Sequence, residues 1–164
     1  MSEQKAPLDV WERVHHISNY YDGPLEGLAN FQGAPHVFFL HDEAFRRIPG
    51  DNPENPEEDD FDVDRTYSLY PVSEQAVAGL IEKHEIFERW HQAYSQDRNA
   101  MEHHPALPDD RARYEALKAE WGPYLEGLRK LAPAHLALGD FHANQREVPA
   151  GYSRWGTYEV KWSS

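Results

Sequence analysis

Two turn signals divide the first forty residues of the chain into short extended segments. Residues 22–24 read Asp-Gly-Pro and residues 32–35 read Gln-Gly-Ala-Pro. Glycine accepts a positive φ and proline fixes its own φ, so both stretches are typical of tight turns. The segments 9–20, 25–31 and 36–40 around them are rich in aromatic and β-branched residues. We therefore expect an antiparallel meander of three strands, with Gly27 marking a bulge or a close approach of two backbones.

The rest of the chain adds one strand to this meander and then becomes helical. Ser73 is a good N-cap for a helix over 73–97, and Asp109 or Asp110 caps a second helix that Gly122-Pro123 should kink or split. The further strands that we expect span 65–72, 135–142 and 157–162. Strands followed by helices indicate an α+β fold. We expect a single domain over 1–164, in which a β-meander of about four strands is packed on one face by two to three helices, with additional strands near the C-terminus.

Charge is the most distinctive bulk property of this 164-residue chain, whose formal net charge is −13. Residues 51–64 (DNPENPEEDDFDVD) carry eight acids, two prolines and no base. Such a run cannot bury apolar surface, so we expect an acidic, mobile loop. An acidic surface disfavours nucleic acid and anionic membranes and suits a partner with a basic surface.

Cysteine is absent, which excludes disulfides and thiolate ligands, and the N-terminal residues lack the apolar run of a signal peptide. No apolar segment approaches the ~20 residues that a membrane-spanning helix needs. We expect a soluble, cytoplasmic protein, rich in aromatic residues, and no obligatory cofactor.

The segment 82–94 holds the sharpest candidate for chemistry. At 100° per residue His84, Glu88 and His91 fall within about 60° of one another on one face of a helix. Two imidazoles and a carboxylate at this spacing suit a divalent metal, which would make the protein a metal-dependent hydrolase. Apolar residues share the same face, which favours a packed stripe with two hydrogen-bonded histidines over a metal site.

The remaining polar clusters fit known motifs poorly. His41-Asp42-Glu43, with His36 or His15-His16 on neighbouring strands, could form an acid–base pair or a metal site. Asp60, Asp62 and Asp64 alternate as in an EF-hand loop, but the required glycine and glutamate are missing. Phosphate-binding loops, dinucleotide fingerprints, zinc-protease motifs and nucleophile elbows are also absent from the sequence. These absences favour a protein without catalytic activity.

Three stretches carry a resemblance to a known family. They are Tyr20-Tyr21-Asp22-Gly23-Pro24 with the following Gly27, Ala29, Phe31, Gly33 and Pro35-His36; the segment IFERWHQAY (86–94); and the string HPALPDDRARY (104–114). Together, in this order, they cover about half of the chain, which resembles a family of small bacterial proteins of unknown function. The resemblance implies no catalytic residue, because no chemistry is assigned to the family.

Three functions follow, in order of preference. The first is a non-enzymatic interaction protein, such as an immunity-type protein or inhibitor that engages a basic partner. The second is a small-ligand or peptide-binding module with its pocket where the turn from Tyr20 to Gly27 meets the helices, with one of the two adjacent tyrosines in the core and the other free to meet a ligand or partner. The third is the metal-dependent hydrolase. The candidate binding residues are Tyr20, Tyr21, Asp22, Gly23, His36, Asp59, Asp60 and Asp62, and the candidate metal ligands are His84, Glu88 and His91.

Overall fold

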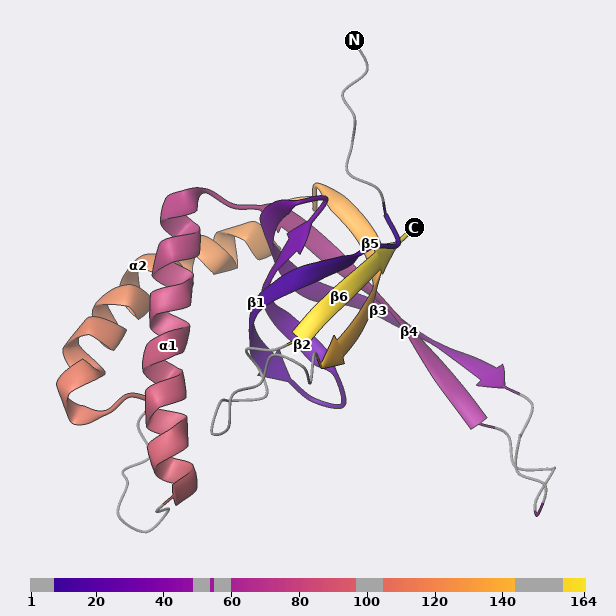
Figure 1. Ribbon diagram of the computed structural model, residues 1–164. Coiled ribbons are helices and arrows are strands. Elements are labelled where there is room, and N and C mark those ends of the chain that lie inside the picture. The colour runs from indigo at the N-terminus through magenta and orange to yellow at the C-terminus, as the bar shows by residue number, and fades with distance from the viewer. Residues whose placement is uncertain (1–7, 49–53, 55–59, 97–104, 144–157) are drawn as a thin grey trace.

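The computed structural model of the protein describes residues 8–48, 54, 60–96, 105–143 and 158–164. Six strands and two α-helices follow one another in the order shown in Figure 1. The strands are β1 (Trp11–Tyr20), β2 (Pro24–Phe31), β3 (Ala34–Ile48), β4 (Asp60–Pro71), β5 (His135–Ala143) and β6 (Tyr158–Ser163). The helices are α1 (Glu74–Gln96) and α2 (Arg111–Arg129), the latter preceded by a short 3₁₀ turn (Pro108–Asp110).

The six strands form a closed antiparallel barrel, in which each strand pairs with its neighbour in sequence and β6 pairs with β1. The predicted α+β arrangement, an open meander covered on one face by helices, is therefore wrong. The C-terminal strands were expected, but their role was not: β5 adds to the edge of β4, and β6 joins β5 to β1. Closure removes the exposed edges that an open meander would leave.

Aromatic side chains fill the interior of the barrel. Phe38, Tyr67, Phe141 and Trp162 pack edge to face or tilted, with ring centroids 5.1–6.2 Å apart. The indole Nε1 of Trp162 donates a hydrogen bond to the carbonyl oxygen of Asn30 at 2.8 Å, so burial leaves no polar atom of this ring unpaired. These rings contact one another closely, so each one restricts the movement of its neighbours and the strands that carry them are held in place.

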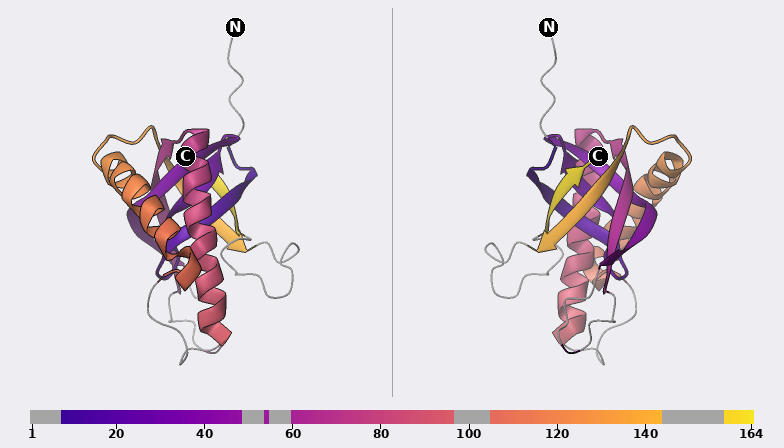
Figure 2. Two further views of the ribbon diagram at one scale, coloured as in Figure 1. Left: turned by 90° about the vertical axis from the view of Figure 1, so that its left-hand side faces the viewer. Right: turned by 90° about the vertical axis from the view of Figure 1, so that its right-hand side faces the viewer.

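The two helices pack together on the outside of the barrel, against β2, β3 and the end of β4. Figures 1 and 2 show both helices on the same side of the barrel. A second apolar cluster lies between the helices and the wall: Leu28, Val37, Phe39, Tyr70, Ala76, Leu80, Ile86, Ala106, Leu117 and Trp121. Residues 37–39 alternate between the two clusters, since Phe38 points into the barrel. Burial on both faces explains the continuous apolar run in this strand.

The predicted cap of α1 and the turn at 32–35 are confirmed, whereas Asp110 occupies the N-cap position of α2 without a side-chain capping hydrogen bond. Ser73 Oγ accepts a hydrogen bond from the backbone N–H of Ala76 at 3.2 Å and so caps α1. Gln32 and Gly33 both have positive φ, as a two-residue hairpin turn requires, and Glu12 accepts hydrogen bonds from both of their N–H groups. Pro123 lies within α2, which runs unsplit past it.

The turn between β1 and β2 also forms as expected. Asp22 and Gly23 both have positive φ, and the Asp22 carbonyl oxygen accepts a hydrogen bond from the guanidinium of Arg65. Inside the barrel, the Tyr67 hydroxyl donates to the carbonyl oxygen of Pro24 at 2.7 Å. The turn is thus held from both ends by residues of β4.

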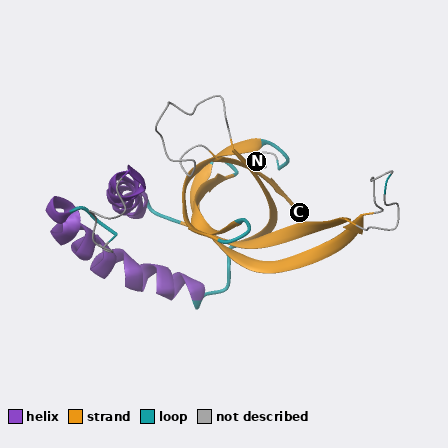
Figure 3. Cartoon of the chain, turned by 90° about the horizontal axis from the view of Figure 1, so that it is seen from below, coloured by secondary structure: helices purple, strands orange, loops and turns teal. Residues whose placement is uncertain are grey.

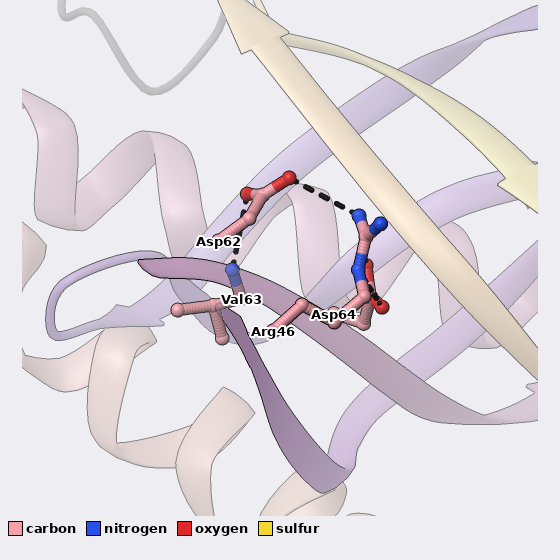
Figure 4. Close-up of polar contacts among 4 residues, drawn as sticks. All are labelled: Arg46, Asp62, Val63 and Asp64. Carbon is pink, nitrogen blue, oxygen red and sulfur yellow. Dashed lines mark hydrogen bonds and ion pairs between the residues drawn. The ribbon is translucent and has the colours of Figure 1, made fainter. Parts of the chain in front are cut away.

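Strands β3 and β4 continue past the barrel as a two-stranded arm, which Figure 3 shows leaving the ring on the side away from the helices. The predicted acidic loop 51–64 ends earlier than expected, because residues 60–64 belong to β4. Arg46 of β3 lies opposite Asp62 and pairs with both Asp62 (3.1 Å) and Asp64 (2.6 Å), as Figure 4 shows. Asp59 lies outside the described residues.

Neither described helix is long and apolar enough to cross a membrane.

Candidate functional site

A pocket lies on the outer wall of the barrel, where β1 and β2 face the two helices. Its volume is about 380 Å³. One wall is the pair of strands and the other is a stripe of α1 at helical spacing, namely Leu80, Lys83, His84 and Phe87. The remaining lining residues are His16, Ile17, Ser18, Asn19, Glu26, Gly27, Val37, Pro105, Tyr114 and Leu125.

A bulge in β1 turns His16 toward this pocket. Val14 and Ile17 both belong to the interior of the barrel, although a regular strand would place residues three apart on opposite faces. The pairing of β1 with β2 shifts between Val14 and His16, which absorbs the extra residue His15. The bulge leaves His16 on the outer face, against α1, while His15 bonds Asn30 Oδ1 through Nε2 at 2.8 Å.

His16 and His84 stack at the seam between the barrel and α1. Their ring centroids are 4.7 Å apart and their planes differ by 14°. His16 is only 5% exposed, and neither of its ring nitrogens has a hydrogen-bond partner among the described residues. Burial is the largest cause that holds the pKa of His16 well below its usual value, followed by the charges of His84, His15 and Lys83. His16 is therefore a neutral imidazole near pH 7.

His84 also lies beside a carboxylate. Its Nε2 is 3.0 Å from Glu88 Oε1, an ion-pair distance at which the two atoms nevertheless lack hydrogen-bonding geometry. Only one of these two groups, His84, lines the pocket. Glu88 thus belongs to the support of the histidine pair and not to the wall of the cavity.

Lys83 brings a positive charge to the pocket. Its side chain is half-buried, and its Nζ lies over the ring of Tyr114 on α2, 5.5 Å from the centroid. Burial lowers the pKa of Lys83, the charge of Lys118 lowers it further, and Glu26 opposes both. Glu26, the one acid among the described residues of the lining, is ion-paired with Arg129 of α2.

Gly27 lets the two strands and the barrel interior come close together behind the pocket. A Cβ at this position would lie 2.3 Å from the carbonyl oxygen of His16 and 2.7 Å from Cζ of Phe38. The predicted close backbone approach at Gly27 is confirmed. The register of β1 against β2, and with it the position of His16, depends on a residue without a side chain here.

The residues proposed from the YYDGP stretch do not gather into this site. Tyr20 and Tyr21 are 40% and 77% exposed, so the expectation that one of them packs in the core is wrong. Tyr20, Asp22 and Gly23 lie at the Pro24 end of β2, whereas His36 pairs with Ala29 toward its other end. His36 is buried and its Nδ1 donates to the carbonyl oxygen of Ala34 at 2.8 Å.

The predicted metal ligands are only partly brought together. His84 and Glu88 lie side by side, but His91 stacks on Phe87 with centroids 5.8 Å apart. Within the described part of the chain, no group of three or more histidine or acidic side chains is placed to hold a metal ion. His41 is exposed, with Ser68 Oγ 3.4 Å from its Nδ1.

Two polar groups matter most in the pocket. Sequence reasoning named His16 only as a neighbour of the His41 cluster, and it missed Lys83. The signal for Lys83 was present, because it occupies the same helical stripe as Leu80, His84 and Phe87. No local pattern reveals the orientation of His16, since the bulge that sets it arises from pairing with β2.

Comparisons of the chain with protein-family models, with curated proteins and with solved structures gave no match.

Proposed function

We propose that this protein binds a small organic molecule in the pocket between the outer wall of its barrel and the two helices. The volume of about 380 Å³ falls in the range of roughly 300–1,000 Å³ that is typical of ligand pockets. The lining also has the composition of such sites, because apolar walls surround a small number of converging polar groups. The ligand-binding module predicted where the Tyr20–Gly27 turn meets the helices is thus kept as a hypothesis, but neither Tyr20 nor Tyr21 lines the pocket.

The observation that carries this proposal is the combination of His16 and Lys83 on the walls of one cavity. His16 is a buried imidazole with no hydrogen-bond partner among the described residues, and Lys83 is a half-buried cation. An unpaired buried polar group costs about 1–3 kcal/mol, so its retention needs a reason. A bound molecule, with the water that accompanies it, supplies partners for both groups.

The hypothesis of an interaction protein with a basic partner gains less support from the described residues. Three acids of β3 and β4 are already paired with arginines of the same two strands: Asp62 and Asp64 with Arg46, and Glu43 with Arg65 at 3.1 Å. These pairs reduce the charge that the arm offers to a partner. Interaction through the remaining acids stays a prediction.

A titration with small aromatic and aliphatic fragments, followed by the backbone amide signals in NMR, tests the proposal. We expect fragments to shift the signals of Ser18, Lys83 and Tyr114, which line the pocket from three different elements. Ser18→Trp places an indole in the cavity and should abolish these shifts. Ala119→Trp, on an exposed position of α2 outside the lining, should leave them unchanged. Absence of fragment binding, or binding that Ser18→Trp does not affect, contradicts the proposal.

A further inference from the structure

The charges around the pocket distinguish between classes of ligand. Among the described residues of the lining, Lys83 and Glu26 are the two that carry a full charge near pH 7. Glu26 is held by Arg129, whose guanidinium also lies 3.6 Å from Glu126. Lys83 has no carboxylate within ion-pair distance in the part of the chain described, and its contact is the face of Tyr114. The charge left for a ligand is therefore positive.

A cationic ligand would meet an unfavourable site. It would have to compete with Arg129 for Glu26, and it would lie beside Lys83 while Lys118 adds to the positive field. An anionic group would not compete with Arg129 for Glu26, and it would be attracted by Lys83 and Lys118 instead of repelled. It would stabilise the protonated form of Lys83, which burial disfavours, through a charge-assisted hydrogen bond in a partly desolvated site.

The number of donors indicates an anion of low charge. Phosphate groups in proteins are usually held by arginine forks, by several cations or by a nest of backbone N–H groups. The described lining offers one ammonium group and two imidazoles, of which His16 is neutral. A single carboxylate, which has one negative charge and four lone pairs, matches this set better than a phosphate does.

The apolar walls indicate the shape of the remainder of the molecule. Phe87 of α1 and Tyr114 of α2 present rings to the cavity, and Leu80 and Leu125 extend the apolar surface behind them. Aromatic rings gain favourable energy from offset or edge contacts with other rings, beyond the burial of their area. A flat ring fits between two helices that each contribute an aromatic side chain.

Resting on the proposed ligand-binding function, we infer that the ligand is a small aromatic monocarboxylate. Its carboxylate pairs with Lys83, and its ring lies against Phe87 and Tyr114. The stacked His16–His84 pair forms the polar floor beside the carboxylate, at the seam between β1 and α1.

A series of three molecules of equal size tests the charge of the ligand directly. 3-Phenylpropanoate is an anion, 3-phenylpropanamide is neutral and 3-phenylpropylamine is a cation. We expect the carboxylate to bind the wild-type protein about tenfold more tightly than the amide, and the amine to bind most weakly. A tenfold difference corresponds to about 1.4 kcal/mol, which we assign to the charge-assisted hydrogen bond. Isothermal titration calorimetry with each compound measures the three dissociation constants.

Variants at position 83 show whether Lys83 causes the preference for the carboxylate. Lys83→Met keeps the length and apolar stem of the side chain and should remove the preference for the carboxylate while leaving affinity for the amide unchanged. Lys83→Arg should retain the preference. Lys130→Met, at an exposed position outside the lining and not part of the field at Lys83, serves as the matched control and should behave like the wild type.

The outcomes separate this inference from the proposed function. If amide and carboxylate bind equally, if the amine binds best, or if none of the three binds while other fragments occupy the pocket, the ligand class is wrong and the pocket proposal stands. If no fragment of any charge binds, the proposed function itself fails. A preference for the carboxylate that persists in Lys83→Met would show that another cation recognises the anion, which also overturns the inference.

Discussion

The spacing of the two helices, and hence the width of the pocket, depends on Gly79. This residue of α1 lies directly beneath the indole of Trp121 on α2. A Cβ at position 79 would lie 2.0 Å from Nε1 and 2.5 Å from Cε2 of that ring. Ordinary contacts between such atoms are about 3.5–4.0 Å, so the ring or the helix would have to retreat by about 1.5 Å in Gly79→Ala.

Two opposing terms set the magnitude of this effect. Replacing a helical glycine by alanine stabilises the helix by up to about 1 kcal/mol, whereas overpacking a well-filled interface costs typically 1–3 kcal/mol. Gly127→Ala in α2 isolates the first term, because a Cβ there would meet nothing within 4 Å. The free energy of unfolding should therefore be about 1–3 kcal/mol lower in Gly79→Ala than in Gly127→Ala.

Urea denaturation followed by far-ultraviolet circular dichroism measures both variants under the same conditions. Trp121→Phe removes the part of the ring that the new methyl group would strike. In the double variant Gly79→Ala/Trp121→Phe, the two substitutions should therefore couple favourably by 1 kcal/mol or more, within the range of roughly 0.5–3 kcal/mol seen for residues in contact. Equal stability of Gly79→Ala and Gly127→Ala would refute the contact, as would strict additivity in the double variant.

Two further predictions concern the interior of the barrel and the histidine pair. Tyr67→Phe removes the hydroxyl that donates a hydrogen bond to the carbonyl oxygen of Pro24. Because this buried acceptor loses its partner, the free energy of unfolding measured by urea denaturation should fall by about 1–3 kcal/mol. An unchanged denaturation midpoint would contradict the role of this bond in holding the β1–β2 turn. The pKa of His16 is lower in the folded protein than in the unfolded chain, so on acidification the unfolded state binds a proton at His16 before the folded state does. The stability that neutral His16 contributes is therefore complete above pH 6.5 and is lost as the pH falls below this value. His15 and His36, whose pKa values burial also lowers, should add to the same trend. Comparing the wild type with His16→Phe between pH 7.5 and pH 5 checks the assignment: the variant should lose stability less steeply, and parallel curves would exclude His16 as a source of the pH dependence.

The sequence by itself determined the local elements of this protein. The positive φ values of Gly23 and Gly33 belong to turns that their residue types indicate, and the Ser73 cap begins α1 as expected. These features depend on interactions between residues a few positions apart. The chain reveals them without knowledge of what lies nearby in space.

The tertiary structure decided the barrel and the site. Closure joins β1 to β6, where Trp11 pairs with Lys161 across almost the whole chain, and no local pattern specifies such a pairing. The exposed tyrosines of the opening turn looked like a site because their types suit binding, but the pocket is lined by residues 16–19 of β1 and by the helices, and by neither tyrosine. His16 and Lys83 face one cavity because a bulge in β1 and the helical stripe of α1 meet across it. Orientation and mutual distance are the properties that chemistry requires, and both follow from long-range pairing rather than from residue type.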